Sequence, residues 1–248
     1  MKTTDLAWKI GSAVFVVAMT LASCSSDDPS ATGAVNVKME ATSSTGATIT
    51  GRSAATTVIT DVKISLREVE FEIDKEDPRY KTDSIYDEDV KLKGPFVVDL
   101  FESSAFAEQL VTTVNLPNGT YEEVEFKMHK NLEPGEMNGK SILIKGTIDG
   151  TPFVFWHDTD EEFEIDFESA ASDVVVNGNA TAIVINLQLE QLFSTVKGGI
   201  NLSLATDGDG DGVIEINPGS SDNDGNKDIA DAIKNLIEEA TDLIDDKD

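Results

Sequence analysis

The feature that most constrains this chain is a two-residue alternation of apolar and polar side chains that extends from about Gly33 to Ala205. In its clearest stretch, Phe163, Ile165 and Phe167 alternate with acidic residues. Successive side chains of a β-strand point to opposite faces, so this pattern places apolar groups on one face and carboxylates on the other. The alternation therefore predicts half-buried strands in antiparallel sheets.

Strand patterning recurs along this region, at about 34–40, 46–50, 57–73, 95–100, 111–116, 120–129, 141–148, 152–157, 162–168, 173–177, 180–190 and 199–205. Each sheet built from these segments must bury its apolar face against another layer. We therefore predict a mainly β protein, an antiparallel β-sandwich of about 10–12 strands. Short helical turns are expected at 103–110 and 190–196, together with one C-terminal amphipathic helix.

Local signals predict two irregularities and one long loop. The alternation shifts phase by one residue at Arg67–Glu68, and a β-bulge there would return both halves of the segment to the same core face. Asp149–Gly150 separates two strand patterns and favours a two-residue hairpin, because both positions of such a turn need positive φ angles. The charged stretch 74–93 is typical of a polar loop.

Residues 1–23 have the organisation of a secretory signal peptide, with two Lys residues before an apolar run of about thirteen residues, too short to span a bilayer. The stretch Leu21–Ala22–Ser23–Cys24 resembles the bacterial lipobox, which implies that Cys24 is lipidated and becomes the first mature residue. Residues 24–32 are then a flexible tether. The resemblance implies that the membrane is a partner through this lipid anchor.

Charge and cysteine usage exclude several classes of partner. The chain carries 47 Asp and Glu against 19 Lys and Arg, a net charge of -28. Such a surface repels phosphate backbones, which excludes nucleic acid as a partner. The single Cys cannot form an internal disulfide. The acidic segment after Cys24 resembles the export signal of Bacteroidota-type surface lipoproteins. It predicts an outer-membrane protein anchored at the cell surface, with the periplasmic face as the alternative.

Several short features resemble a family of uncharacterised Bacteroidota-type lipoproteins with a transthyretin-like or carboxypeptidase-regulatory-like β-sandwich. These features are the Gly-x-Val-x-Val strand at 33–37, the Val-Asp-Leu segment at 98–100 and the Pro-x-Gly-x-Tyr turn at 117–121. The resemblance extends over about residues 33–195. It implies a sandwich domain, predicted at 33–205, and a family with no agreed biochemical activity.

An acidic segment, predicted at 206–225, follows the sandwich and resembles the calcium loop of EF-hands and dockerins. Asp207, Asp209 and Asp211 occupy the first, third and fifth positions, and Gly212 occupies the sixth. At this spacing, alternate side chains of a tight loop converge on one hard cation. The alternative interpretation is a solvated acidic linker.

The resemblance also implies a ligand from the Val213 carbonyl and another from Glu215, either directly or through water. Pro218 stands at the twelfth position, where a bidentate acid is expected. The next acidic run could fill this gap, and its candidate ligands are Asp222, Asp224 and Asp228. We predict a structural Ca²⁺ ion with a weak, extracellular-type dissociation constant of about 10⁻⁴ to 10⁻³ M.

Residues 226–246 carry apolar side chains at helical spacing, namely Ile229, Ile233, Leu236, Ile237, Ala240, Leu243 and Ile244. This stripe predicts an amphipathic helix packed on the sandwich, with Asn226 or Asp224 as its N-cap. The alternative is that the stripe docks into a groove of a partner.

The sequence lacks a nucleophile elbow, a zincin motif and a phosphate-binding glycine loop. His157 lies in an acidic stretch, 156–162, that favours a strand end followed by a charged loop over a metal or acid–base site. We predict a protein without enzymatic activity that binds an unknown protein or glycan partner or has a structural role. The alternatives are a calcium-dependent carbohydrate-active enzyme that uses carboxylates at 158–168, or a periplasmic accessory subunit of an envelope assembly.

Overall fold

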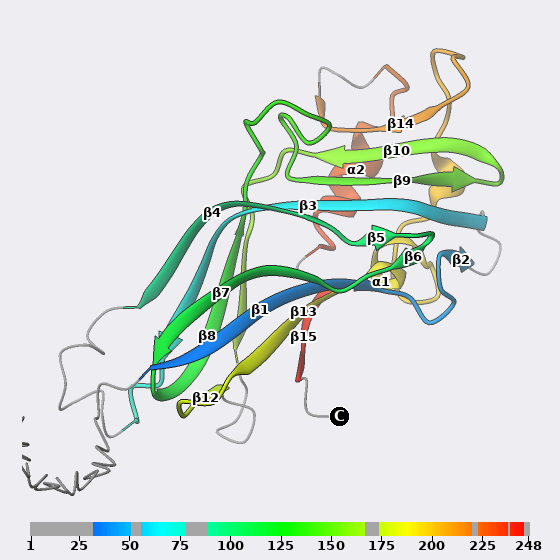
Figure 1. The fold of residues 1–248 in the computed structure, drawn as a ribbon. Helices are drawn as coiled ribbons and strands as arrows, with labels where there is room; N and C mark the ends of the chain where they lie inside the picture. Colours follow the sequence, from blue (N-terminus) through cyan, green and yellow to red (C-terminus); the bar gives the residue numbers. More distant parts are fainter. Residues whose placement is uncertain are drawn as a thin grey trace, which may run out of the picture.

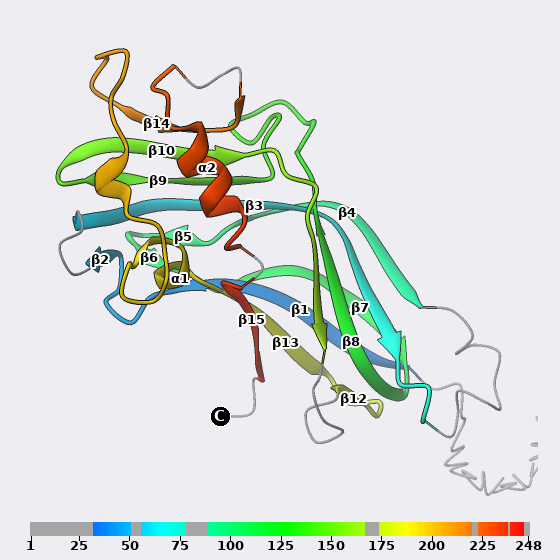
Figure 2. The ribbon, with the colours of Figure 1, turned by 180° about the vertical axis from the view of Figure 1, so that it is seen from behind.

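The computed structural model describes residues 32–50, 56–77, 89–166, 174–219, 223–237 and 239–245. The predicted signal peptide, Cys24 and most of the tether lie outside these residues. In the described part, two sheets pack face to face (Figures 1 and 2). The helices are α1 (Leu189–Phe193) and α2 (Lys227–Lys234). The predicted mainly β, sandwich-like class is confirmed.

The smaller sheet has the strand order β15, β13, β1, β7. Its strands are β1 (Thr32–Thr42), β7 (Gln109–Pro117), β13 (Thr181–Gln188) and β15 (Thr241–Asp245). β1 pairs in parallel with β13 and antiparallel with β7. The first strand of the described chain is therefore an internal strand with a partner on each side.

The larger sheet has the order β11, β8, β3, β9, β10, β14, and three further strands pair with β3 or β8. Its strands are β2 (Thr48–Thr50), β3 (Thr56–Ile73), β4 (Val90–Asp99), β8 (Gly119–Met128), β9 (Ile142–Ile148), β10 (Thr151–His157), β11 (Glu162–Asp166), β12 (Val174–Val176) and β14 (Ile214–Ile216). The 18-residue β3 is the spine of this sheet, because β2, β4, β8 and β9 all pair with it.

The core lies between the two sheets. Val37 and Ile185 from the smaller sheet, and Leu66, Phe71 and Phe126 from the larger one, are each at most 2% exposed. Burial of a large apolar side chain contributes about 1.5–3 kcal/mol. The strict alternation of the sequence reflects this core, since each strand presents one face to it.

Both irregularities predicted from the sequence are present. The register of β3 against β8 shifts just after Leu66, so Arg67 is an extra residue on β3. On the two sides of this bulge, Leu66 and Val69 are both buried, as the phase shift requires. Asp149 and Gly150, with φ angles of 49° and 88°, form the turn that joins β9 to β10.

Two strand pairs depart from the predicted antiparallel arrangement. β1 pairs in parallel with β13, and β10 pairs in parallel with β14. Parallel neighbours need a long connection, and the strands of each pair are far apart in the sequence: Val35 lies opposite Thr181, and Phe153 lies opposite Ile214. The periodicity of a strand reports which face is buried, not the direction of its neighbour.

The helical turn predicted at 103–110 is also wrong. The chain there forms a small hairpin of β5 (Phe101–Glu102) and β6 (Ala105–Phe106). Ser103 and Ser104 have positive φ angles of 52° and 66°, which suit a two-residue hairpin turn. The rings of Phe101 and Phe106 meet edge to face across the hairpin, and this contact outweighs the local helical pattern.

Two neighbouring predictions have different outcomes. The helical turn predicted at 190–196 is confirmed as α1. The strand predicted at 199–205 is wrong, because the segment contains a 3-10 turn, η2 (Leu202–Leu204). The Asn201 side chain accepts a hydrogen bond from the Ser203 N–H and starts this turn.

The C-terminal helix is shorter than predicted. α2 ends at Lys234, and Thr241–Asp245 form β15, which pairs with Ile183–Leu187 of β13. Without β15, β13 would expose a row of unpaired backbone groups on the side away from β1, so strand pairing there outweighs continued helix. Ile237, between the two elements, is 1% exposed. Neither helix of the described part has the length and apolar character needed to cross a membrane.

Candidate metal centre

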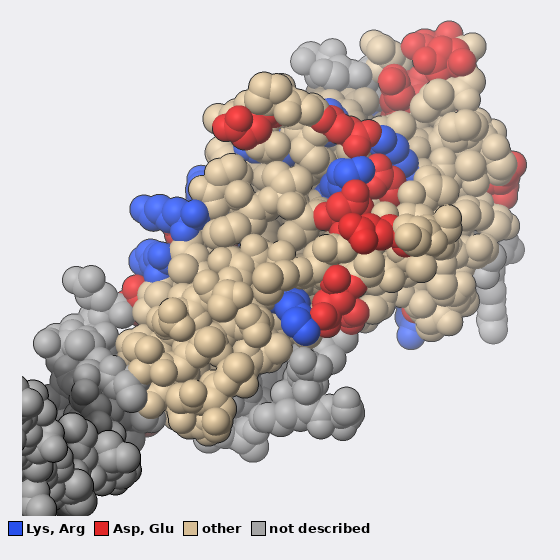
Figure 3. All heavy atoms as spheres, in the orientation of Figure 1, with Lys and Arg blue, Asp and Glu red and all other residues tan. Residues whose placement is uncertain are grey.

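The acidic loop lies at one end of the molecule, between η2 and β14. β14 pairs with β10, with Ile214 opposite Phe153, and this pairing fixes the end of the loop to the larger sheet. Figure 3 shows acidic side chains gathered at the same end. β1 begins at the opposite end of the molecule (Figure 1).

The loop is shaped by its own carboxylates. Asp207 accepts hydrogen bonds from the backbone N–H groups of Gly210 and Gly212, at 2.8 and 2.9 Å. Asp211 accepts another from the Val213 N–H, at 2.8 Å. Aspartates that bond to the backbone ahead of them favour turns. Gly210 and Gly212 have φ angles of 78° and 93°, which glycine adopts at little steric cost.

Asp224, from the second acidic run, closes the loop. It is 6% exposed. Its Oδ1 accepts hydrogen bonds from the N–H groups of Gly208 and Asp209, at 2.9 and 3.2 Å, and its Oδ2 accepts one from Glu215, at 2.6 Å. A Cβ on Gly208 would lie 2.5 Å from the Asp224 carbonyl oxygen. The close approach of the two segments therefore requires glycine at this position.

Asn226 joins both ends of the loop to α2. It occupies the predicted N-cap position, but its side chain makes no capping hydrogen bond. Instead, Oδ1 accepts from the Thr206 N–H, and Nδ2 donates to the carbonyls of Thr206 and Glu215. The sequence predicts only the capping role, because these partners are far away along the chain.

The structure brings five of the predicted ligand carboxylates together in two overlapping groups. One group contains Asp207, Asp209 and Asp211, and the other contains Asp209, Glu215 and Asp224. Within each group, oxygen atoms from the three side chains lie within 4.8 Å of one another. This span is twice a calcium–oxygen distance of about 2.4 Å, and carboxylate oxygens are the ligands that calcium prefers. Asp224 thus brings the carboxylate that Pro218 cannot supply.

Among the other predicted ligands, Asp228 belongs to neither group, and the Val213 carbonyl stays a prediction. Val213 was expected to bind through its carbonyl, and the structure shows its N–H bonded to Asp211. Asp228 is exposed in the first turn of α2, where its charge favours the positive end of the helix dipole. Asp222 and Cys24 lie outside the described residues.

Helix α2 follows the loop and packs on β10. His157 is the last residue of β10, and its ring lies near α2, with Nε2 3.6 Å from Asp231 Oδ1 and Nδ1 3.9 Å from Asp158 Oδ1. These distances are too long for hydrogen bonds, and both ring nitrogens are buried without one. Burial lowers the pKa of His157 below its usual 6.5, although the two aspartates favour the charged form.

Two of the carboxylates in the 158–168 region are held in ion pairs. Glu161 pairs with Lys234 of α2, and Glu162 pairs with Lys127 of β8. In each case the lysine is the main reason that the pKa of the carboxyl lies below its usual value. Glu161 therefore helps to hold α2 against the larger sheet.

These observations define a class of protein, a two-sheet β-sandwich with an acidic loop that is closed by a buried aspartate and a buried asparagine. A family model described as a domain of unknown function, DUF4382, matches residues 26–228, from the predicted tether to the start of α2. The chain belongs to this family. No curated protein and no solved structure matches it.

Replacing Asp224 by Ala should lower the free energy of unfolding by about 2–4 kcal/mol without any divalent cation, because three N–H groups lose a charged acceptor. Urea denaturation in EDTA measures the change. Asp228→Ala is the matched control in the same segment, and removal of its exposed charge should cost at most about 0.5–1 kcal/mol. Equal losses from the two variants would contradict the closing role of Asp224.

The buried His157 should make the protein less stable in mild acid. Because its pKa is lowered on folding, the unfolded chain binds a proton that the folded protein does not. The stabilisation is complete above about pH 6.5 and decreases as the pH falls from there toward the folded pKa. Urea midpoints between about pH 7.5 and 5.5 should therefore fall less steeply in His157→Gln than in the wild type. An equal pH dependence of the urea midpoint in the two proteins would contradict the destabilising role of His157 in acid.

Proposed function

We propose that this protein is a lipid-anchored β-sandwich of the bacterial cell envelope, exposed at the cell surface, with a non-enzymatic binding or structural role and a structural Ca²⁺ ion in its acidic loop. The observation that carries the proposal is the meeting of five carboxylates in two groups that share Asp209. Two acidic runs that are separate in the sequence contribute to the second group.

The electrostatics of the loop support a structural ion. Carboxylates this close repel one another, and a divalent cation between them turns the repulsion into attraction. β14 connects the loop to β10, and Asn226 connects it to α2. A bound ion would therefore hold the C-terminal segment on the larger sheet.

The position of the loop supports the proposed orientation. Thr32, the first residue of β1, follows Cys24 after a short polar segment. β1 begins at the end of the molecule opposite the acidic loop (Figures 1 and 2). In a protein anchored at Cys24, the loop would face away from the membrane, toward the medium that supplies calcium.

Calcium binding can be tested by isothermal titration of the protein without residues 1–23. We expect a dissociation constant of about 10⁻⁴ to 10⁻³ M. At about 10 mM CaCl₂, binding should then raise the free energy of unfolding by about 1.4–2.7 kcal/mol relative to EDTA.

A double variant, Asp209→Ala with Asp211→Ala, should lose both the heat and the stabilisation, because it removes ligands from both groups. Glu102→Ala is the control, since Glu102 is an exposed carboxylate on β5 outside both groups. Absence of heat in the unmodified chain, or equal heat from the double variant, would reject the calcium site.

The anchor has its own test in cells. Cys24→Ser should move the protein from the detergent-soluble membrane fraction to the aqueous fraction, because no thiol remains for lipid attachment. Ser25→Ala, one residue further on, should stay in the membrane fraction. Added protease should degrade the wild-type protein on intact cells. Full protection from the protease would place it on the periplasmic side instead.

A further inference from the structure

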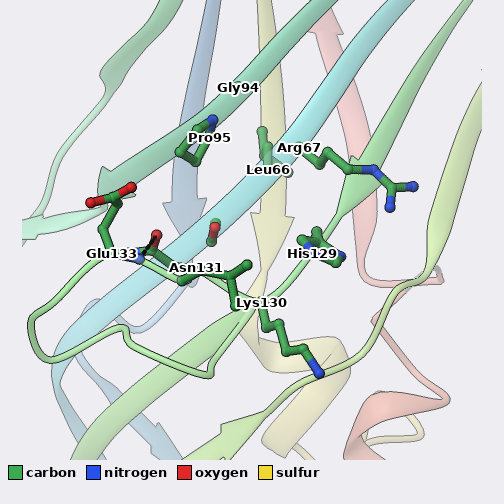
Figure 4. Close-up of a pocket in the computed structure, with 10 residues that line it drawn as sticks. Leu66, Arg67, Gly94, Pro95, His129, Lys130, Asn131 and Glu133 are labelled. Carbon is green, nitrogen blue, oxygen red and sulfur yellow. Dashed lines mark hydrogen bonds between the residues drawn. The ribbon is translucent and has the colours of Figure 1, made fainter.

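A cavity of about 200 Å³ lies beside the middle of β3 and is distinct from the acidic loop. Three segments that are remote in the sequence line it, namely Ser65–Arg67 of β3, Gly94–Pro95 of β4 and the residues 129–133 that follow β8 (Figure 4). None of these residues belongs to the calcium groups described above.

Two register shifts at the same level of the larger sheet accompany this cavity. Arg67 is an extra residue on β3 relative to β8. On the other side of β3, the pair Gly94–Pro95 stands opposite the same Arg67. A Cβ on Gly94 would lie 2.6 Å from the Leu66 carbonyl oxygen, so the close approach of the strands requires glycine. Bulges redirect side chains and are frequent beside functional sites.

Two buried polar side chains that line the cavity carry hydrogen-bond donors that no described residue accepts from. Ser65 is 1% exposed and Asn131 is 7% exposed. The Asn131 Oδ1 accepts from the Glu133 N–H, which leaves its NH₂ group as a donor. Among the described residues, neither that NH₂ group nor the Ser65 hydroxyl has a partner. Both donors are therefore available to an acceptor that enters the cavity.

Basic side chains that form no ion pair with a described residue also lie near the cavity. Most Lys side chains of the described part form ion pairs, but five basic side chains form none with a described residue, namely Arg67, Lys93, Lys130, Lys140 and Lys197. Of these, Lys140 donates to the Glu136 carbonyl and lies over the Trp156 ring. Arg67 and Lys130 line the cavity, and Lys93 directly precedes the lining residue Gly94. In a chain of net charge -28, this concentration of free cations makes the cavity a local site for an anion.

Basic and acidic side chains lie on opposite sides of the cavity. Arg67, His129 and Lys130 lie on one side, and Glu133 lies on the other (Figure 4). The head groups of Arg67 and Lys130 extend outward from the rim, so each can turn toward a bound anion. The Arg67 charge also acts on Glu162, where it adds to the larger effect of Lys127 in lowering the pKa of that carboxyl.

We propose that this cavity binds a small organic carboxylate with a short apolar body. The carboxylate accepts hydrogen bonds from the Ser65 hydroxyl and the Asn131 amide, and it is neutralised by Arg67 and Lys130. The hydrocarbon part packs on the apolar lining, which consists of Leu66, Pro95 and Leu132.

The size and lining of the cavity define the ligand class. A volume of about 200 Å³ lies below the roughly 300–1,000 Å³ that accommodates drug-sized molecules, which limits the body to a few carbon atoms. Inorganic phosphate has no apolar surface to bury against the lining, whereas each CH₂ group of a carboxylate gains about 0.8 kcal/mol on burial.

The test is a titration of the ¹⁵N-labelled chain from Cys24 onward, followed by amide chemical shifts. Hexanoate is the probe, with hexan-1-ol as its neutral analogue and inorganic phosphate as the anion without an apolar body. Hexanoate should cause saturable shifts at Ser65–Arg67 and 129–133, and neither analogue should do so at the same concentrations.

The double variant Arg67→Gln with Lys130→Gln should weaken hexanoate binding about tenfold or more, because both cations that neutralise the carboxylate are lost. Lys197→Gln is the matched control, since Lys197 is also unpaired but does not line the cavity. Unchanged shifts elsewhere in the spectrum establish that the variants are folded. Equal binding of hexan-1-ol, undiminished binding by the double variant, or no saturable shift at the cavity would each overturn the proposal.

Discussion

The backbone ladder of β3 is the constraint on which the rest of the structure depends. This strand pairs with β2, β4, β8 and β9, so its register decides the register of most of the larger sheet. Because side chains alternate between faces, a slip of one residue would turn its buried side chains outward. The bulge at Arg67 absorbs one residue and keeps Leu66 and Val69 on the core side. The cavity beside β3 lies at the same bulge.

The acidic end is held by different interactions. β14 is a three-residue strand, and α2 buries only two side chains, those of Ala230 and Ile233. Asp224 and Asn226 add hydrogen bonds that join the loop, β14 and the start of α2. Polar contacts with fixed geometry therefore position this segment, and its conformation depends on two buried side chains that are close together in the sequence.

The sequence predicts the features whose causes are local. The phase shift at Arg67 and the Asp149–Gly150 dipeptide each specify one backbone irregularity, and both are present. The spacing of Asp207, Asp209 and Asp211 likewise brings their carboxylates together, because a tight loop closes over few residues. In these cases the sequence pattern that predicts the feature lies within a short segment of the chain.

Features that depend on residues far apart in the sequence cannot be predicted from local patterns. The apolar stripe after Asn226 has helical spacing. Its end nevertheless forms β15, because it pairs with β13, a strand far upstream in the sequence. The bonds of Asn226 and the cavity lining depend in the same way on segments that meet only in the folded chain. Local periodicity also carries no information on the parallel partner of β10.

The internal position of β1 has a mechanical consequence. It is bonded to β13 from Val35 to Thr42 and to β7 from Thr32 to Met39. A chain held at its amino-terminal end and pulled at the other transmits the force along the axis of β1. The hydrogen bonds to both neighbours run across that axis, so they resist the load together instead of opening one by one from an edge. β1, the strand nearest the predicted tether, is therefore the one best placed to withstand shear. The lifetime of the folded protein under such tension is set by its rate of unfolding.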